Sequence, residues 1–351
     1  MSALALTAQA EAGPQKNKGK KKPRCRKGKS RCGGKCRNLQ SSAKHCGTCG
    51  NQCAADQNCV AGVCSVPCQE FACISNQIDA KQVVSSVSAM SNGDLAMLVP
   101  GDSQILVMTT AGKQVRRIGS FGPDPGELWN PLDLSVANDD TFYVAEFRGG
   151  NGSNGRLQAF YPDGTFDVVP VGFSRNVGAG DGRWYGGDYW WINRIQNGAA
   201  SYKFGFTGND GANSNRFDNV TGIAVAAGGK VYAVNGNFPD QGGETVGMVY
   251  AFTDNGSLPV TVNWGVGGPG TGPGLFNNAS GIAVAGNQVF VADTDNRRVQ
   301  VLSTTDGSFL FQWTTTDRDG NEVKPESITV HPDGTVYVTA DEMLYGYTLI
   351  A

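Results

Sequence analysis

Four oxygen-bearing side chains recur at one equivalent place along the chain, each at the end of a short apolar run: Glu146, Asp188, Asn235 and Asp293. Carboxylate and amide oxygens are the ligands that Ca²⁺ takes in proteins. If these side chains share a central space, they could gather a divalent cation such as calcium. We favour the alternative that each one accepts hydrogen bonds from its own turn, as side chains in Asx turns do.

The sequence holds no conventional catalytic constellation. Its two histidines, His45 and His331, are too few for a histidine-based zinc centre, and no Ser, Cys or Lys stands in a nucleophile motif. An enzymatic interpretation therefore rests on Glu146, Asn235 and Asp293 around a central metal. This is the arrangement of a metal-dependent hydrolase or lactonase of the gluconolactonase-like type, and only the fold-level period supports it.

Aromatic and loop residues indicate a second kind of chemistry, the binding of a partner. The stretch RWYGGDYWWINRI groups five rings that could stack on sugar rings or on a peptide, although packing between sheets also uses aromatic residues. The stretch NGNFPDQGGETVG is a loop extension of the kind that forms contact surfaces. The candidate binding residues are Trp184, Tyr185, Tyr189, Trp190, Trp191, Asn237, Phe238 and Asp240.

A repeat supplies the elements that would position these residues. Runs of alternating apolar residues surround six turns, which are 46, 43, 47, 57 and 48 positions apart, as in IAVAGNQVFVAD from Ile282. The turn residues are Gly93, Asp139, Gly182, Gly229, Gly286 and Gly334. Period-2 alternation that recurs in the forties predicts an all-β fold, a six-bladed β-propeller of four-stranded antiparallel blades.

The last repeat has too little chain after Gly334 for four strands. A strand from the N-terminal side would complete it and hide an edge that invites aggregation. We predict that Phe71–Asn76 forms this outer strand, so that residues 71–351 make one propeller domain.

All ten cysteines lie in a segment that has almost no large apolar residues. An even count in such a segment predicts disulfides that replace a core, whereas zinc would need a second knuckle beside Cys46 and Cys49. We therefore expect a disulfide module over residues 25–70 and a secreted or cell-surface, extracytoplasmic protein. The cysteines are Cys25, Cys32, Cys36, Cys46, Cys49, Cys53, Cys59, Cys64, Cys68 and Cys73.

Charge divides the chain into a basic and an acidic part. Residues 13–45 contain thirteen Lys and Arg and no acid, while residues 71–351 contain sixteen Lys and Arg against twenty-eight Asp and Glu. We interpret residues 1–24 as the remnant of a signal peptide followed by a disordered basic arm. The arm is expected to attract an anionic polymer of the cell wall or an acidic polysaccharide, and the acidic propeller argues against nucleic acid as a partner. No stretch has transmembrane length.

Two stretches resemble known families. Within Gly272–Leu302, the sequence LFNNASGIAVAGNQVFVADTDNRRVQVL resembles the NHL repeat, with its Gly-Ile-Ala-Val strand, its second strand ending in Ala-Asp, and its Asn-Arg pair. Cys32–Cys64 resembles the stigma-specific-protein-like cysteine module of secreted proteins. The resemblance implies an NHL-type six-bladed propeller behind a secreted adapter. We expect a binding or scaffold protein that uses a propeller rim to hold a protein, peptide or glycan.

Overall fold

The computed structural model describes residues 25–42, 44–53, 58–60, 63–65, 69–147, 155–171, 174–187, 191–196, 199–204, 217, 219–236, 247–257 and 260–350. The chain divides into two compact units, and Val66 begins the longer C-terminal stretch of the larger one. Each unit is described by itself.

The smaller unit is held by covalent links rather than by a core of large side chains. Its strands form two hairpins, β1 (Ser30–Cys32) with β2 (Lys35–Arg37) and β3 (Asn58–Val60) with β4 (Val63–Ser65). Disulfides join Cys25 to Cys36, Cys32 to Cys49 and Cys46 to Cys59, and Cys53 is disulfide-bonded as well. Cys73, which belongs to the larger unit, is also disulfide-bonded. The prediction of disulfide-linked cysteines is confirmed for these eight, while Cys68 and the side chain of Cys64 lie outside what the structure describes.

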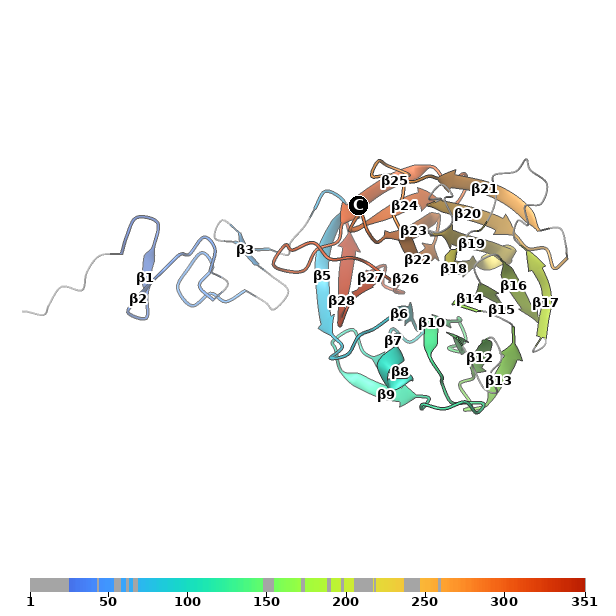
Figure 1. Ribbon diagram of the computed structural model, residues 1–351. Coiled ribbons are helices and arrows are strands. Elements are labelled where there is room, and N and C mark those ends of the chain that lie inside the picture. The colour runs from blue at the N-terminus through green and yellow to red at the C-terminus, as the bar shows by residue number, and fades with distance from the viewer. Residues whose placement is uncertain are drawn as a thin grey trace, which may run out of the picture. The chain divides into compact units, whose positions relative to one another are not determined.

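The larger unit is a six-bladed propeller in which each blade is one four-stranded antiparallel sheet (Figure 1). Blades 1 to 3 are β6 (Ser86–Ala89), β7 (Leu95–Val99), β8 (Gln104–Met108), β9 (Gln114–Ile118); β10 (Pro131–Val136), β11 (Phe142–Glu146), β12 (Arg156–Phe160), β13 (Phe166–Pro170); and β14 (Asn176–Gly180), β15 (Arg183–Gly187), β16 (Ile192–Gln196), β17 (Ala199–Phe204). Blades 4 and 5 are β18 (Val220–Ala226), β19 (Lys230–Asn235), β20 (Met248–Thr253), β21 (Thr261–Gly267); and β22 (Ala279–Ala285), β23 (Gln288–Asp293), β24 (Arg298–Ser303), β25 (Phe309–Thr314). Blade 6 is β26 (Ile328–Val330), β27 (Val336–Ala340), β28 (Met343–Leu349) and β5 (Ala72–Asp79).

The hydrophobic core lies between neighbouring blades. All five residues of β7 and of β27 are buried, because each second strand is covered on both faces by side chains of adjacent blades. One core cluster joins Leu95 and Met97 of blade 1 to Tyr337 and Leu344 of blade 6. The predicted all-β, six-bladed fold is thus confirmed, and the helical segments of the described residues are two three-residue 3-10 turns, Pro100–Asp102 and Ala227–Gly229.

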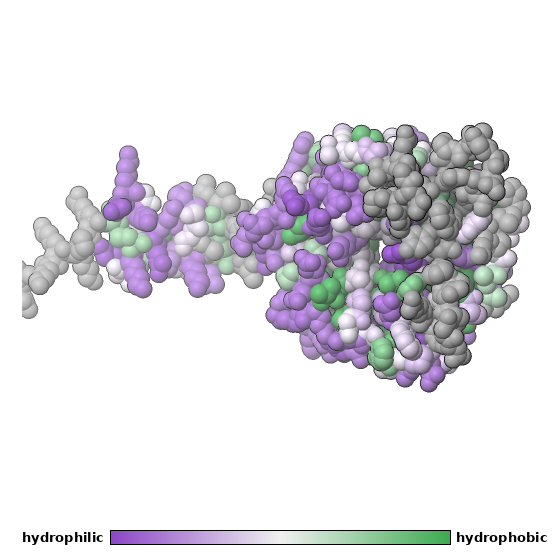
Figure 2. Space-filling model, in the orientation of Figure 1, coloured by the Kyte–Doolittle hydropathy of each residue, from purple (hydrophilic) through white to green (hydrophobic). Residues whose placement is uncertain are grey.

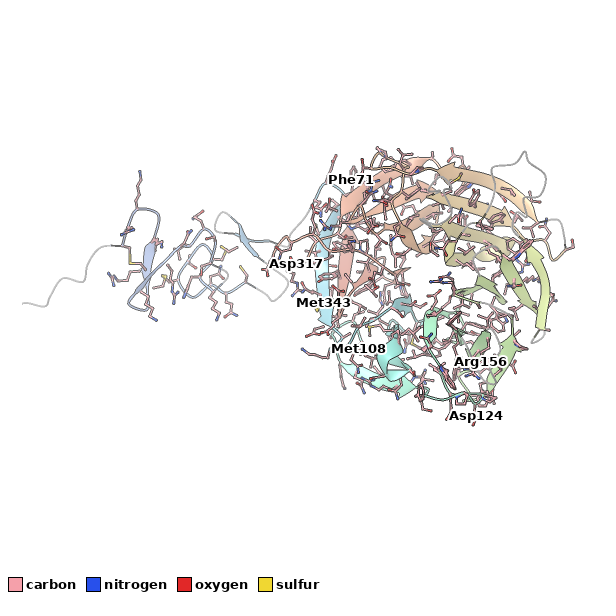
Figure 3. All side chains as sticks on the ribbon, in the orientation of Figure 1. Phe71, Met108, Asp124, Arg156, Asp317 and Met343 are labelled. Carbon is pink, nitrogen blue, oxygen red and sulfur yellow. A yellow bond between two sulfur atoms is a disulfide. The ribbon has the colours of Figure 1, made fainter. Side chains whose placement is uncertain are left out.

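The propeller closes by pairing strands that are distant in sequence. β5 pairs antiparallel with β28, so the strand that the sequence analysis places at Phe71–Asn76 extends from Ala72 to Asp79. Beside it, Gln69 Oε1 accepts the N–H of Thr314 at 2.9 Å, and the Phe71 ring stacks on Phe311 with centroids 5.3 Å apart. Figure 3 shows Phe71 at this seam. The first residues of the segment therefore fasten blade 6 to blade 5 as well.

Candidate functional site

The first strands of all six blades surround a central channel of about 510 Å³. Its lining is rich in hydroxyl groups, and it includes the carboxyl groups of Asp133 and Glu326. Burial raises the pKa of Asp133 to about 6, although three hydrogen bonds to the carboxylate oppose the shift. Glu146, Asn235 and Asp293 are not among the residues that line this channel.

Most of the channel's hydroxyl and carboxyl groups are engaged in joining the blades. At the contacts of blade 6 with blade 1, blade 1 with blade 2 and blade 2 with blade 3, a side chain on or directly before one first strand accepts an N–H from the next first strand. These pairs are Ser327 with Val87 at 3.1 Å, Ser86 with Leu134 at 3.3 Å and Asp133 with Val177 at 2.9 Å.

At the contacts of blade 4 with blade 5 and of blade 5 with blade 6, glycine stands where blades 6, 1 and 2 have these side chains. A Cβ at Gly222 would lie 2.8 Å from the carbonyl oxygen of Ser280, and one at Gly281 would lie 2.9 Å from that of Glu326. The glycine of Gly-Ile-Ala-Val is therefore required by backbone contact between blades. The channel wall therefore joins neighbouring blades, through side chains between blades 6, 1, 2 and 3 and through close backbone contact between blades 4, 5 and 6.

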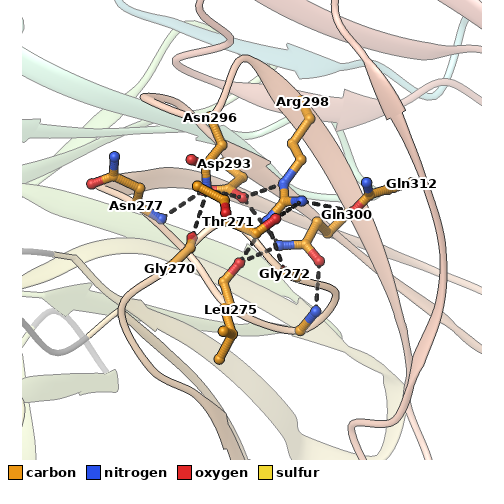
Figure 4. A network of polar contacts seen from close by, with 11 residues as sticks. Gly270, Thr271, Gly272, Leu275, Asn277, Asp293, Asn296, Arg298, Gln300 and Gln312 are labelled. Atoms are coloured by element: carbon orange, nitrogen blue, oxygen red, sulfur yellow. Dashed lines mark hydrogen bonds and ion pairs between the residues drawn. The ribbon is translucent and has the colours of Figure 1, made fainter.

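The carboxylate of Asp293 forms the centre of a buried network in blade 5 (Figure 4). It accepts hydrogen bonds from Arg298 Nε at 2.6 Å and from the N–H of Asn277 at 2.8 Å. Gln300 Nε2 donates to the same carboxylate at 3.0 Å. We call Asp293, Arg298 and Gln300 the blade-5 latch, because together they hold residues 267–278, the blade-5 loop.

The latch binds the blade-5 loop through its backbone. Arg298 donates to three loop carbonyls, and Gln300 donates to one of them and accepts one loop N–H. These contacts are Arg298 to Thr271 O at 2.7 Å, to Gly272 O at 3.0 Å and to Leu275 O at 2.8 Å, and Gln300 to Leu275 O at 2.6 Å and to Gly274 N at 2.8 Å.

Blade 2 contains the same latch, made of Glu146, Arg156 and Gln158. Glu146 Oε2 accepts the N–H of Trp129 at 2.8 Å and pairs with Arg156 Nη2 at 3.1 Å, and burial raises the pKa of Glu146 against these contacts. The blade-2 loop, residues 119–130, is held through Arg156 to Pro123 O at 2.7 Å and Glu127 O at 2.7 Å, and through Gln158 to Glu127 O at 2.6 Å and Gly126 N at 2.9 Å.

Blade 4 replaces the charged pair with a neutral one. Asn235 lies opposite Met248 in the register where Asp293 faces Arg298, and its Oδ1 accepts the N–H of Asn219 at 2.9 Å. These contacts match the alternative that each side chain serves its own blade. Within the described ranges, no group of three or more His, Cys, Asp or Glu is placed to hold a metal ion. The cation hypothesis stays a prediction, since Asp188 lies outside those ranges.

The aromatic cluster predicted in blade 3 is partly buried. Tyr185 is fully buried, and its hydroxyl donates to Asp254 Oδ2 at 2.6 Å. Trp184 is also buried, with its ring 4.7 Å from that of Tyr143, while Trp191 is half-buried. Two of the predicted binding residues, Trp184 and Tyr185, are therefore packed inside the fold. The other candidates lie outside the described residues: Tyr189, Trp190, Asn237, Phe238 and Asp240.

The exposed Phe and Trp side chains of the described residues lie elsewhere, on and beside the blade-2 loop. Phe121 is 70% exposed, Trp129 39% and Phe166 44%, and the rings of Phe121 and Trp129 are 5.8 Å apart. In Figure 3, Asp124 of this loop lies at the outer edge of the ring, outside Arg156. Polar residues cover much of the described surface visible in Figure 2. The stretch that holds Phe121 and Trp129, SFGPDPGELWNP, has the Gly- and Pro-rich composition of a linker between blades, and nothing in it predicted a binding surface.

Comparison with known proteins supports both resemblances. Residues 10–67 match the stigma-specific STIG1-like protein family, and residues 276–302 match the NHL repeat. The NHL repeat-containing protein 3 of Mus musculus is 31% identical over 131 residues, and that of Homo sapiens is 29% identical over 137 residues. These alignments cover 37% and 39% of this chain and only 34% and 36% of the relatives' own length.

Solved structures with similar folds include proteins of several activities. A streptogramin B lyase has a TM-score of 0.51 at 11% identity, covering 77% of this chain and 94% of its own. A PQQ-bound aldose sugar dehydrogenase of Streptomyces coelicolor has a TM-score of 0.50 at 12% identity, covering 82% and 100%. At such identities the likeness shows the fold alone. This chain therefore combines a STIG1-like cysteine-rich segment with an NHL-type six-bladed propeller.

Proposed function

We propose that this protein is an extracytoplasmic binding or scaffold protein that holds a protein, peptide or glycan on the rim of its propeller. The exposed pair of Phe121 and Trp129 carries the proposal. Aromatic side chains supply large contact areas to recognition surfaces, and exposing two neighbouring rings to water has a cost that a bound partner would remove. By contrast, the carboxylates of Glu146 and Asp293 are occupied by backbone and guanidinium groups of their own blades.

Cysteine chemistry supports the location. The described disulfides and the STIG1-like segment are typical of an oxidising compartment, which favours a secreted or cell-surface protein. Among the described residues, no helix could cross a membrane.

The basic arm adds a second proposed contact, with an anionic polymer such as a cell-wall polymer or acidic polysaccharide. The basic run continues from the arm into the disulfide module, where Lys27, Lys29, Arg31, Lys35 and Arg37 are all exposed, and residues 13–45 contain no acid. Deletion of residues 13–31 should abolish sedimentation with an insoluble anionic polysaccharide. Unchanged sedimentation would reject this contact.

Immobilised peptide and glycan arrays test the rim proposal. The full chain should bind a defined subset of spots, and the double variant Phe121→Ala, Trp129→Ala should lose that subset. Leu275→Ala is the matched control, because Leu275 is an exposed large apolar side chain of the equivalent loop in blade 5. Absence of binding, or equal binding by the double variant, would refute the proposal. Stoichiometric divalent metal together with lactone turnover would instead favour the hydrolase alternative.

A further inference from the structure

We infer that the blade-2 loop binds a Lys- or Arg-rich segment of a partner protein. The inference rests on the proposed function and names the partner class for it. It is drawn from side chains that the blade-2 loop carries and that an otherwise equivalent loop of the same molecule does not.

The two loops have the same backbone design. Besides their latches, Leu128 N donates to Ser120 O at 2.7 Å in blade 2, and Phe276 N donates to Gly268 O at 2.9 Å in blade 5. Both loops also contain a hydrogen bond between residues three apart, Glu127 N to Asp124 O at 3.0 Å and Leu275 N to Gly272 O at 3.1 Å. Each residue of one loop therefore has a counterpart 148 positions away in the other.

At four of the positions that differ, the blade-2 loop has an aromatic or acidic side chain and the blade-5 loop has neither. The blade-2 loop has Phe121, Asp124, Glu127 and Trp129 where the blade-5 loop has Pro269, Gly272, Leu275 and Asn277. The latches bind the loops through backbone atoms, among them Glu127 O and Trp129 N in blade 2, and not through the side chains at these positions. The blade-2 loop thus adds two rings and two carboxylates to a backbone that the blade-5 loop forms without them.

The grouped chemistry fits a cationic side chain. The Glu127 carboxylate lies against Gly122, the neighbour of Phe121, where an added Cβ would meet it. Glu127 Oε2 accepts the N–H of Asp124 at 3.1 Å, which fixes the carboxylate within the loop that carries the two rings. A lysine or arginine could place its charge over a ring face while it pairs with this carboxylate, and both contacts favour a cation.

The charge of the domain selects a basic peptide over a neutral sugar. Residues 71–351 carry twenty-eight acids against sixteen Lys and Arg. The Arg156 guanidinium behind the loop is buried and paired with Glu146, so it does not oppose a cation. A domain of net negative charge with two exposed rings attracts a basic segment over a distance and then holds it by contact.

Calorimetric titration of the full chain with decalysine tests the inference, with decaglutamate and maltohexaose as the other probes. A graft that installs the blade-5 residues, Phe121→Pro, Asp124→Gly, Glu127→Leu and Trp129→Asn, should weaken decalysine binding about tenfold or more. Phe121→Ala with Trp129→Ala should weaken it about threefold or more. The control variant Asp319→Asn with Glu342→Gln removes one Asp and one Glu charge, as the graft does, but from exposed sites of blade 6 and the loop before it. It should change the affinity for decalysine less than twofold.

Three results would overturn the inference. An equal loss in the blade-6 control would mean that bulk charge, not the loop, binds decalysine. Unchanged binding in the ring variant would remove the aromatic contribution. Maltohexaose binding that only the graft abolishes, without decalysine binding, would identify a glycan site and leave the proposed function standing. A graft that alters no array spot would refute the proposed function itself.

Discussion

The blade-2 and blade-5 loops show how one repeat separates structure from recognition. Both are held by an acid, an arginine and a glutamine that bind backbone carbonyls and amides. The side chains at four equivalent positions differ in chemistry: the aromatic and acidic groups of the blade-2 loop correspond to Pro, Gly, Leu and Asn in the blade-5 loop. The buried latch is therefore the constraint of the fold, and the outward positions are free to carry a binding surface.

Removal of either arginine should have the largest effect on stability. Arg298→Met leaves Asp293 buried without its guanidinium and several loop carbonyls unpaired, which we expect to cost about 3–5 kcal/mol. Arg156→Met should cost a similar amount in blade 2. Urea unfolding of the full chain measures both. The double variant Asp293→Asn, Arg298→Met imitates Asn235 and Met248 and should recover most of the loss; no recovery would break the analogy with blade 4.

Replacement of the latch glutamines should have the next largest effect on stability, and the effect should be similar in the two blades. Gln158 and Gln300 are fully buried, and each holds one loop carbonyl and one loop N–H. Replacement by alanine leaves these groups unpaired, at about 1–3 kcal/mol. Hydrogen exchange at the amides of Gly126 and Gly274 should accelerate in the respective variant. A large effect in one blade only would show that the two latches are not equivalent.

Alanine at the loop glycines should distinguish the two loops. Gly126 and Gly274 have φ of +87° and +72°, so alanine is strained by roughly 1 kcal/mol in each. A Cβ at Gly126 would also meet the Phe166 ring at 3.0 Å, whereas nothing lies within 4 Å at Gly274. Gly126→Ala should therefore be the more destabilising change in thermal melts. Adding Phe166→Ala should remove the difference, and a persistent difference would point to another contact.

The four-residue graft into the blade-2 loop should have the smallest effect on stability. Its side chains project outward, so the urea midpoint should correspond to a change of about 0.5 kcal/mol or less. A loss above about 1.5 kcal/mol would mean that Phe121 and Trp129 are structural. Their assignment to binding would then fail on stability grounds alone.

The architecture could be predicted from the sequence because each repeat has local features that can be recognised without the rest of the fold. Alternating apolar residues, turn glycines and the short final repeat were enough to predict six blades, and the strand expected at Phe71–Asn76 could be placed by length. The end of each second strand also marked Glu146, Asn235 and Asp293 as related positions. The shared motif of an arginine and a glutamine two residues later, at Arg156 and Arg298, was a further signal that was not used.

The candidate binding surface was not predictable in the same way. Whether a ring is buried depends on which neighbouring blade covers it, and alternation within one strand does not supply that information. Tyr185 lies in an aromatic stretch but packs inward toward Phe204, with centroids 6.0 Å apart. Phe121 and Trp129 lie in a loop with the turn composition of a linker, and only the latch geometry shows that their side chains must face water.

The closing strand has a consequence for the order in which the protein is made. Ser75 in β5 donates to the carbonyl of Gly346 in β28, a partner 271 residues later. During synthesis β5 emerges early and has no partner until β28 follows. Its backbone N–H and C=O groups therefore stay unpaired while the other blades form. Joining such distant segments carries a large chain-closure entropy and slows folding. We therefore expect the ring to be sealed last, and the waiting strand to be the point at which a nascent chain is open to chaperones or to misassociation.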